Sequence, residues 1–214
     1  MPMRTFFFVI LILWPLQPWL SEAIVLDRIL AVVNGEVISQ SDVESDFVFF
    51  SKVENQTRLD RAGNLSDAVI RIGTRELINQ KLLLAEAKRF DVEDPTESQI
   101  HQELEIIQNR FHSPAAFEMA LRQNAMTLED LQKKVKEHLR VNRFIDQRIR
   151  FFVIVLPEEI SGYYSENQGK FKDKTYEEAE KEIEKSLSEA KTKDRLEAYL
   201  SNLRARANIQ INFE

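Results

Sequence analysis

Residues 28–44 (RILAVVNGEVISQSDVE) constrain the fold of this chain more than any other stretch. Two short apolar runs flank Asn34-Gly35. Asn-Gly between such runs is typical of a β-hairpin, because a type I′ turn needs a positive φ at both central residues. Ser41 and Glu44 then have the S-x-x-E spacing of a capping box. The stretch therefore predicts a hairpin that is followed at once by a helix.

The other end of the sequence carries the pattern of a third strand. Residues 208–213 (NIQINF) alternate polar and apolar side chains, which is the period of a half-buried strand. A lone hairpin is only marginally stable in water, and a third strand with an apolar face would stabilise it. We therefore expect the C-terminal strand to pair with the N-terminal hairpin, so that the rest of the chain starts and ends at one small sheet.

Between these strands the sequence predicts helices. Only 5 Gly and 6 Pro occur in 214 residues, and apolar residues repeat at helical spacing between capping motifs. The expected helices cover about residues 42–53, 67–90, 95–111, 114–124, 128–149, 158–167 and 176–207. Asp94 is the expected N-cap of the third and Thr127 that of the fifth. The predicted fold class is mainly α, a helical domain with a small N-terminal β-hairpin paired to the C-terminal strand.

The last predicted helix changes its apolar face part-way along. Apolar residues between 176 and 190 share one face, whereas those between 196 and 207 share another that is more than a right angle away. Either the helix kinks near residues 191–194, or its two halves pack against different bodies. We favour the second interpretation.

The first 23 residues predict a leader for export. Arg4 provides a positive charge, residues 5–13 (TFFFVILIL) form an apolar run, and Ser21-Glu22-Ala23 has the small-x-small pattern of a cleavage site. An uncleaved membrane anchor is the alternative, but the apolar run is short and prolines interrupt its continuation. We expect cleavage after Ala23, no membrane-spanning segment in the remaining chain, and a bacterial periplasm as the compartment.

Composition limits the partners of the chain. There is no cysteine, so an exported protein of this kind is held together by packing alone. The net charge of −6 argues against binding to nucleic acid or to an anionic membrane surface.

The sequence contains no motif that points to catalysis. His101, His112 and His138 have no cysteine or acidic partner at metal-ligand spacing, and no Gly-rich phosphate loop or nucleophile elbow occurs. His138 lies on the apolar stripe of the fifth predicted helix, so we interpret it as a hydrogen-bonded packing residue. We therefore expect no enzyme, no cofactor and no metal.

Aromatic and methionine residues are the strongest candidates for a binding surface. Several fall off the main apolar stripes of their helices, and adaptable side chains of this kind suit a promiscuous binder of unfolded chains. The alternative is ordinary packing between subdomains; for Phe49 we weigh exposure and packing equally. The candidate client-binding residues are Phe49, Phe117, Met119, Met126, Phe144 and Phe151. The apolar segment at residues 151–156 is expected to be short and extended or buried.

Five stretches resemble the SurA-type periplasmic chaperones and their relatives PpiD and PrsA. They are LDRILAVVNGEVISQSDVE, RELINQKLLLAEAKRFDVEDPTESQI, NAMTLEDLQKKVKEHLRVNRFI, LPEEISGYYSENQGKF and RLEAYLSNLRARANIQI. Together they cover nearly the whole chain after the leader. The resemblance implies one chaperone domain that is built from the N-terminal helices and the C-terminal helix and strand, with a groove or cradle for unfolded outer-membrane polypeptides.

The sequence departs from the full-length relatives at one place. Those proteins carry one or more parvulin-type prolyl isomerase domains between the YY-x-EN-x-x-KF helix and the last helix, whereas only about residues 172–175 occupy this position here. The resemblance therefore implies the chaperone body without the isomerase. We expect a leader at 1–23, a hairpin and helical core at 24–156, and C-terminal helices and a strand at 157–214 that return to the same core.

The function predicted from these observations is that of an ATP-independent periplasmic holdase for unfolded outer-membrane or secreted polypeptides. Self-association into a homo-oligomer is left open. Two alternatives remain: a prolyl isomerase, which the missing domain disfavours, and an adaptor that binds one folded partner.

Overall fold

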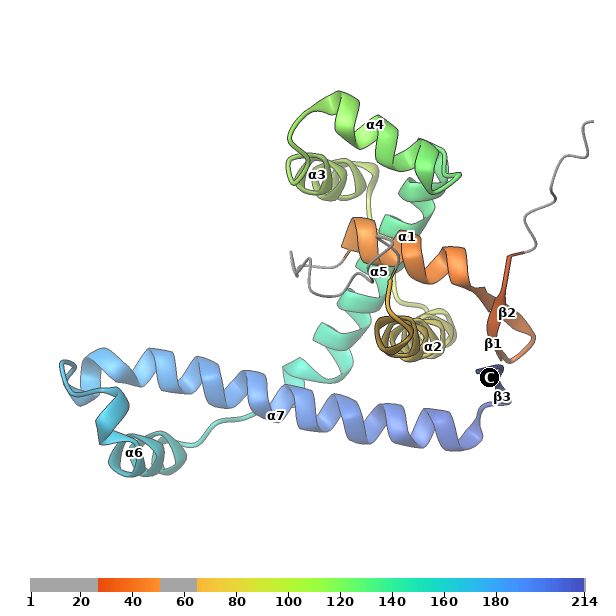
Figure 1. Ribbon diagram of the computed structural model, residues 1–214. Coiled ribbons are helices and arrows are strands. Elements are labelled where there is room, and N and C mark those ends of the chain that lie inside the picture. Colours follow the sequence, from red (N-terminus) through yellow and green to blue (C-terminus); the bar gives the residue numbers. More distant parts are fainter. Residues whose placement is uncertain (1–26, 51–64, 214) are drawn as a thin grey trace, which may run out of the picture.

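The computed structural model describes residues 27–50 and 65–213, and these residues are mainly helical (Figure 1). The predicted leader and the end of the first predicted helix lie outside the described residues. The elements are β1 (Ile29–Val33), β2 (Glu36–Ser39), α1 (Gln40–Phe50), α2 (Asp67–Arg89), α3 (Glu97–Gln108), α4 (Pro114–Gln123), α5 (Leu128–Arg148), the 3₁₀ turn η2 (Arg150–Phe152), α6 (Pro157–Glu166), the 3₁₀ turn η3 (Gln168–Lys170), α7 (Tyr176–Arg206) and β3 (Ile209–Ile211).

The three strands form the antiparallel sheet that both ends of the sequence predict. The strand order is β2-β1-β3, and β3 pairs with β1 so that Ala31 faces Ile211. Asn34 and Gly35 both have positive φ, 50° and 89°, as a type I′ turn requires. Asn34 also accepts a 2.9 Å hydrogen bond from the Asn208 backbone through its side chain. The hairpin residues therefore fix the position of β3 as well as the turn, and the predicted pairing is confirmed.

Two helix starts differ from the prediction in the residue that caps them. At α1 the hydroxyl of Ser39 accepts a hydrogen bond from the Asp42 backbone, and the Asp42 carboxylate accepts one from the Ser39 backbone. The helix thus begins two residues earlier than the Ser41 motif indicated. At α3 the N-cap is Thr96, in a capping box with Gln99, so the expected Asp94 cap was wrong. Thr127 caps α5 with Asp130 as predicted.

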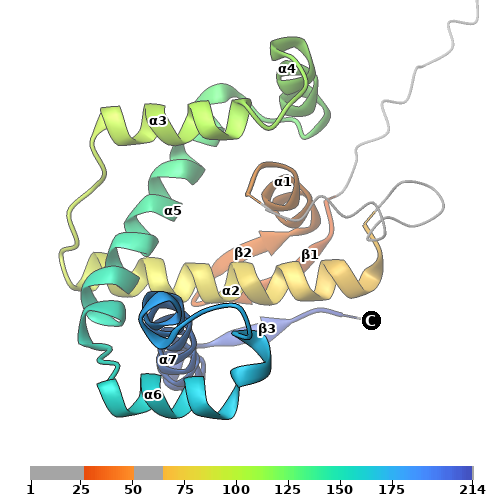
Figure 2. The ribbon, with the colours of Figure 1, turned by 90° about the vertical axis from the view of Figure 1, so that its left-hand side faces the viewer.

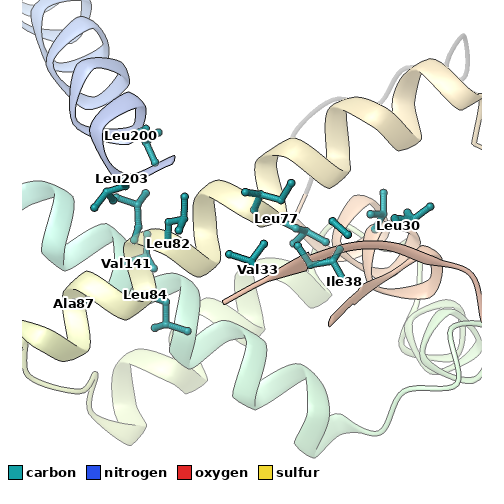
Figure 3. Packing of buried hydrophobic residues seen from close by; sticks show 14 of the residues in the cluster. Leu30, Val33, Ile38, Leu77, Leu82, Leu84, Ala87, Val141, Leu200 and Leu203 are labelled. Carbon is teal, nitrogen blue, oxygen red and sulfur yellow. The ribbon is translucent and has the colours of Figure 1, made fainter. Parts of the chain in front are cut away.

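Apolar side chains gather in three separate cores. The first core joins the sheet to α1, α2, α5 and the end of α7; Figure 2 shows α2 lying between the hairpin and α7. Figure 3 shows Leu30, Val33 and Ile38 from the sheet pointing toward α2, with Leu200 and Leu203 of α7 on its other side. The helix α2 is apolar nearly all round because it is covered on several faces.

The second core belongs to the lobe formed by α3, α4 and the first half of α5, and α1 reaches it as well. Val43 of α1 packs in the first core, whereas Phe49 is fully buried in the second. At Val43, Gly73 of α2 lies so close to α1 that a Cβ on Gly73 would come within 2.6 Å of Val43 Cγ1. The helix α1 therefore joins two cores, which explains its apolar residues on more than one face.

The third core lies in an arm made by α6 and the first half of α7 (Figure 1). Ile160, Phe171, Ala179 and Ile183 are its buried residues. The helix α7 is continuous over its 31 residues, and its first half packs in this arm while its second half packs in the first core. The interpretation that the two halves contact different bodies is confirmed, and no kink is needed to explain the change of face.

A polar contact joins α7 to α2 beside the first core. The hydroxyl of Tyr199 donates a hydrogen bond to the Glu86 carboxylate, which also accepts one from Arg89 at 2.7 Å. Burial raises the pKa of Tyr199 to about 12, and the hydrogen bond to Glu86 adds to the rise. The neutral phenol is therefore the form that the folded protein favours.

This contact predicts a loss of stability at alkaline pH. Because the folded-state pKa lies above the ordinary value of 10.0, the contribution of Tyr199 is fully present below pH 10 and is lost as pH rises from there through about 12. We expect Tyr199→Phe to cost about 1 kcal/mol near neutral pH and to weaken the alkaline decline. Urea unfolding of both proteins across this range measures the effect; parallel pH curves would contradict it.

Candidate polypeptide-binding surface

Three of the six candidate binding residues are buried. Phe49 and Phe144 have no exposed surface, and Phe117 has almost none. Phe49 packs between Phe111 and Phe117, at ring-centroid distances of 6.0 and 6.2 Å. The expectation that Phe117 and Phe144 lie on the surface is wrong, and of the two interpretations of Phe49 the packing one holds. Phe49 and Phe144 belong to helices that contribute to both the first and the second core, whereas Phe117 lies in the second core.

The other three candidates lie at or near the surface. Met119 on α4 is 53% exposed and Phe151 is 78% exposed, while Met126 is half-buried against the second core. These residues are not neighbours: Met119 and Met126 belong to the α3–α4 lobe, and Phe151 follows α5 at the other end of that helix. The six candidates therefore do not form one site.

A groove of about 390 Å³ lies where α1, α2, α5 and α7 meet. We call it the central groove. Ile72, which is 57% exposed, lies on its α2 wall. Most of the lining is apolar: Val43, Phe47, Phe50, Val69, Ile72, Leu83, Val141, Ile145, Leu196 and Leu200, with Asp46, Gly73, Glu76, Asn79, Gln80 and His138 as the other residues. Residues from four helices make this groove, so no single stripe in the sequence reveals it.

His138 has a structural role at the wall of the central groove. Its Nε2 lies 3.3 Å from Oδ1 of Asp46, and its ring stacks on Phe50 at a centroid distance of 4.0 Å. This arrangement confirms the interpretation of His138 as a hydrogen-bonded packing residue.

The central groove continues into a charged cleft between the end of α5 and the middle of α7. Ile145 and Leu196 line both. The remaining residues of the charged cleft are Asn142, Asp146, Arg150, Lys185, Ser188, Glu189, Thr192 and Lys193. Charged side chains of both signs therefore lie beside one end of the apolar central groove.

The segment of residues 151–156 is largely exposed. We call it the apolar linker; it comprises the last two residues of η2 and the connection from η2 to α6 (Figure 1). Phe151, Phe152, Ile154 and Leu156 all face solvent, so the part of the prediction that described it as buried was wrong. Its backbone is extended at Val153 and at Leu156, as the other part of that prediction proposed.

The ionisable groups of the described residues provide no catalytic constellation. Hydrogen bonding to Lys136 lowers the pKa of Asp94, and hydrogen bonding to Lys81 lowers that of Glu36. The Thr127 cap lowers the pKa of Asp130. These shifts come from ion pairs and helix caps, and none of the three carboxylates lines the central groove. Within residues 27–50 and 65–213 no cluster of three metal-ligating side chains occurs.

Two further observations concern domains and membranes. The helix α6 ends at Glu166 and α7 begins at Tyr176, with only the turn η3 between them, so the chain has no parvulin domain at this position. No helix in the described ranges combines the length and hydropathy needed to cross a bilayer.

The described residues form a mainly helical domain that is closed by a small sheet of its first and last strands and that carries an apolar groove. The sequence model of the SurA-like N-terminal domain matches residues 3–145, more than half of the chain. The chain therefore belongs to the SurA-like N-terminal domain family, as its sequence resemblance implied.

The fold is also similar to a solved structure from a study of PEB4 and Cj1289, two structurally related SurA-like chaperones of Campylobacter jejuni. The similarity covers 87% of this chain and 100% of that one, with a TM-score of 0.51 and 12% sequence identity. At this identity the likeness supports the fold alone. A search of curated proteins finds no match.

Proposed function

We propose that this protein is an ATP-independent chaperone that holds unfolded exported polypeptides, outer-membrane proteins among them, in the periplasm. The observation that carries the proposal is the central groove, an apolar surface made by four helices that leaves Ile72 exposed to solvent. A groove of this kind gains free energy from any apolar side chain that enters it, without a sequence-specific requirement. Membership in the SurA-like family supports the same function.

The proposal includes release without nucleotide and no isomerase activity. Outer-membrane barrel strands alternate apolar and polar residues over about ten residues, so such clients present the side chains that the groove would bury. The client leaves when its own folding buries those side chains. Export through the predicted leader would place the chaperone where such clients occur.

The test is suppression of aggregation by the chain without its leader, residues 24–214. A urea-unfolded outer-membrane barrel protein is diluted into buffer with this chain, and light scattering is followed. We expect suppression near stoichiometric amounts in the absence of nucleotide. Indifference to the unfolded protein, beside a working control chaperone, would overturn the proposal and favour an adaptor for one folded partner.

The same assay locates the activity with a matched pair of variants. Ile72→Asp places a charge in the central groove, whereas Ile106→Asp places one on α3 at a residue that is 47% exposed and remote from the groove. Because both side chains are exposed, neither change is expected to unfold the protein. We expect Ile72→Asp to lose most of the suppression and Ile106→Asp to retain it; equal activity of the two variants would remove the groove from the mechanism.

A further inference from the structure

The apolar linker is the most exposed apolar segment among the described residues. Phe151 is 78% and Ile154 is 70% exposed, and Phe152 and Leu156 are each about half exposed. Single exposed apolar residues are common, but a contiguous group of large ones marks an interaction site in a folded protein. None of these four residues belongs to either of the two large cores.

The linker presents its side chains in the alternating way of a β-strand. Phe152, Ile154 and Leu156 are exposed, whereas Val153 and Val155 between them are half-buried. Val155 packs against the core of the arm. Since successive side chains of an extended segment point to opposite sides, one face of the linker is attached to the protein and the other is free.

Cationic side chains of α7 hold the linker in this orientation. The ammonium group of Lys191 donates a 2.8 Å hydrogen bond to the backbone carbonyl of Ile154, and Arg195 donates one of 3.2 Å to that of Phe152. Lys191 also pairs with Glu159, whose carboxylate accepts a 2.8 Å hydrogen bond from the Leu156 backbone. These hydrogen bonds fix the backbone at both ends of the exposed face. The apolar side chains are therefore exposed to solvent in a preformed arrangement.

The size of this surface favours an extended polypeptide segment over a second copy of the chain. A stable protein dimer buries about 800 Å² on each partner, contributed by about 20–30 residues, whereas the linker offers four large side chains. A short extended segment needs only such a narrow surface. Binding to a fixed surface also avoids much of the ordering cost on the protein side.

The charge of Arg195 and the position of Arg150 also favour an extended polypeptide as the ligand of the linker. Arg195 lies over the Phe152 ring, with its guanidinium carbon 5.7 Å from the ring centroid, and it forms no ion pair with a carboxylate of the described residues. It could pair with a carboxylate of a bound chain. Arg150, next to Phe151, lines the charged cleft that continues from the central groove. One unfolded chain could thus reach the groove and the linker together.

We propose that the apolar linker is a second, preformed contact for unfolded polypeptides, which binds an extended segment of alternating large apolar side chains with an acidic residue beside them. This proposal rests on the proposed chaperone function and specifies the sequence pattern of the polypeptide segments that would bind. The bound segment would pack its apolar side chains on Phe152, Ile154 and Leu156 and place its carboxylate at Arg195.

The test compares a linker variant with a matched surface variant. Phe152→Ser with Ile154→Ser removes two of the three apolar side chains of the exposed face, and Ile106→Ser with Leu128→Ser removes similarly exposed side chains from the lobe of α3, α4 and the first half of α5. Circular dichroism and thermal unfolding verify that both fold. The probe is a labelled peptide of alternating Phe, Leu and Ser residues with one Glu, followed by fluorescence anisotropy.

We expect the linker variant to bind the peptide about tenfold more weakly than the unaltered chain, because two large apolar contacts are lost, and the lobe variant to bind within about twofold. Replacing Glu by Gln in the peptide should weaken binding by the unaltered chain severalfold. Equal binding by both variants would overturn the proposal. Self-association of the unaltered chain that the linker variant loses would also overturn it, in favour of a second copy.

The aggregation assay separates this proposal from the broader one. If the unaltered chain suppresses aggregation and the linker variant does so equally well, the linker proposal fails while the chaperone function stands. If the unaltered chain neither suppresses aggregation nor binds the peptide, both proposals fail.

Discussion

Replacing Phe144 by alanine is expected to lower the free energy of unfolding by about 3–5 kcal/mol. Phe144 has no exposed surface and lies in the first core. Its ring contacts Phe90 at a centroid distance of 6.0 Å and Tyr199 at 5.8 Å, so it joins α2, α5 and α7. The cavity would form where these three helices meet, and little of the surrounding structure could collapse into it.

Chemical denaturation monitored by circular dichroism measures this loss. Phe144→Leu keeps most of the volume and should cost less than about 1.5 kcal/mol, whereas Phe151→Ala, at an exposed residue, should stay within about 0.5 kcal/mol. A small effect at Phe144 together with a large one at Phe151 would show that the two side chains had been assigned to the wrong environments.

Phe49→Ala is expected to lower the free energy of unfolding by a similar amount, about 3–5 kcal/mol. The destabilised part of the protein should, however, be a different one. Phe49 enters the second core from α1, between Phe111 and Phe117. Its removal takes away the main apolar contact between α1 and the α3–α4 lobe. Because that lobe has a core of its own, we expect it to lose stability first while the sheet and α2 remain folded.

Hydrogen exchange is the measurement that separates these cases. In the Phe49→Ala protein, amides of α3 and α4 should exchange faster than those of α2, whereas in the Phe144→Ala protein the loss of protection should include α2 and α7. Uniform acceleration over the whole chain in both proteins would mean that the first and second cores unfold as one unit. Client binding per folded molecule should be unchanged by either substitution.

The sheet and the helix order could be predicted because local chemistry determines them. Asn34-Gly35 specifies its turn by itself, and the alternation at residues 208–213 specifies a strand that needs a partner. The caps were harder to assign. Ser39-x-x-Asp42 and Ser41-x-x-Glu44 overlap in the sequence, and the end of β2, which depends on its pairing with β1, decides between them.

The burial of the aromatic residues could not be read from single helices. A side chain off the main apolar stripe is exposed if one core exists and buried if a second core covers that face, and the sequence pattern is the same in both cases. Phe49 and Phe144 are of this kind. The exposure of the apolar linker depends on Lys191 and Arg195, which lie about forty residues further along the chain, so its own sequence carries no sign of it. Likewise, the central groove exists only once four helices have assembled.

The pairing of β1 with β3 has a consequence for the order in which the protein folds. Ala31 and Ile211 are partners, so the loop that this strand pair closes comprises about 180 residues, and the entropic cost of closing such a loop is on the order of 4–5 kcal/mol. Three residue pairs of a short strand cannot offset this cost by themselves. The end of α7 must first dock on α2 and bring Ile209 to the hairpin. Since β3 follows β1 by about 180 residues, the edge of β1 that β3 covers stays open until this docking has occurred, and the β1–β3 pairing forms after the helices have assembled.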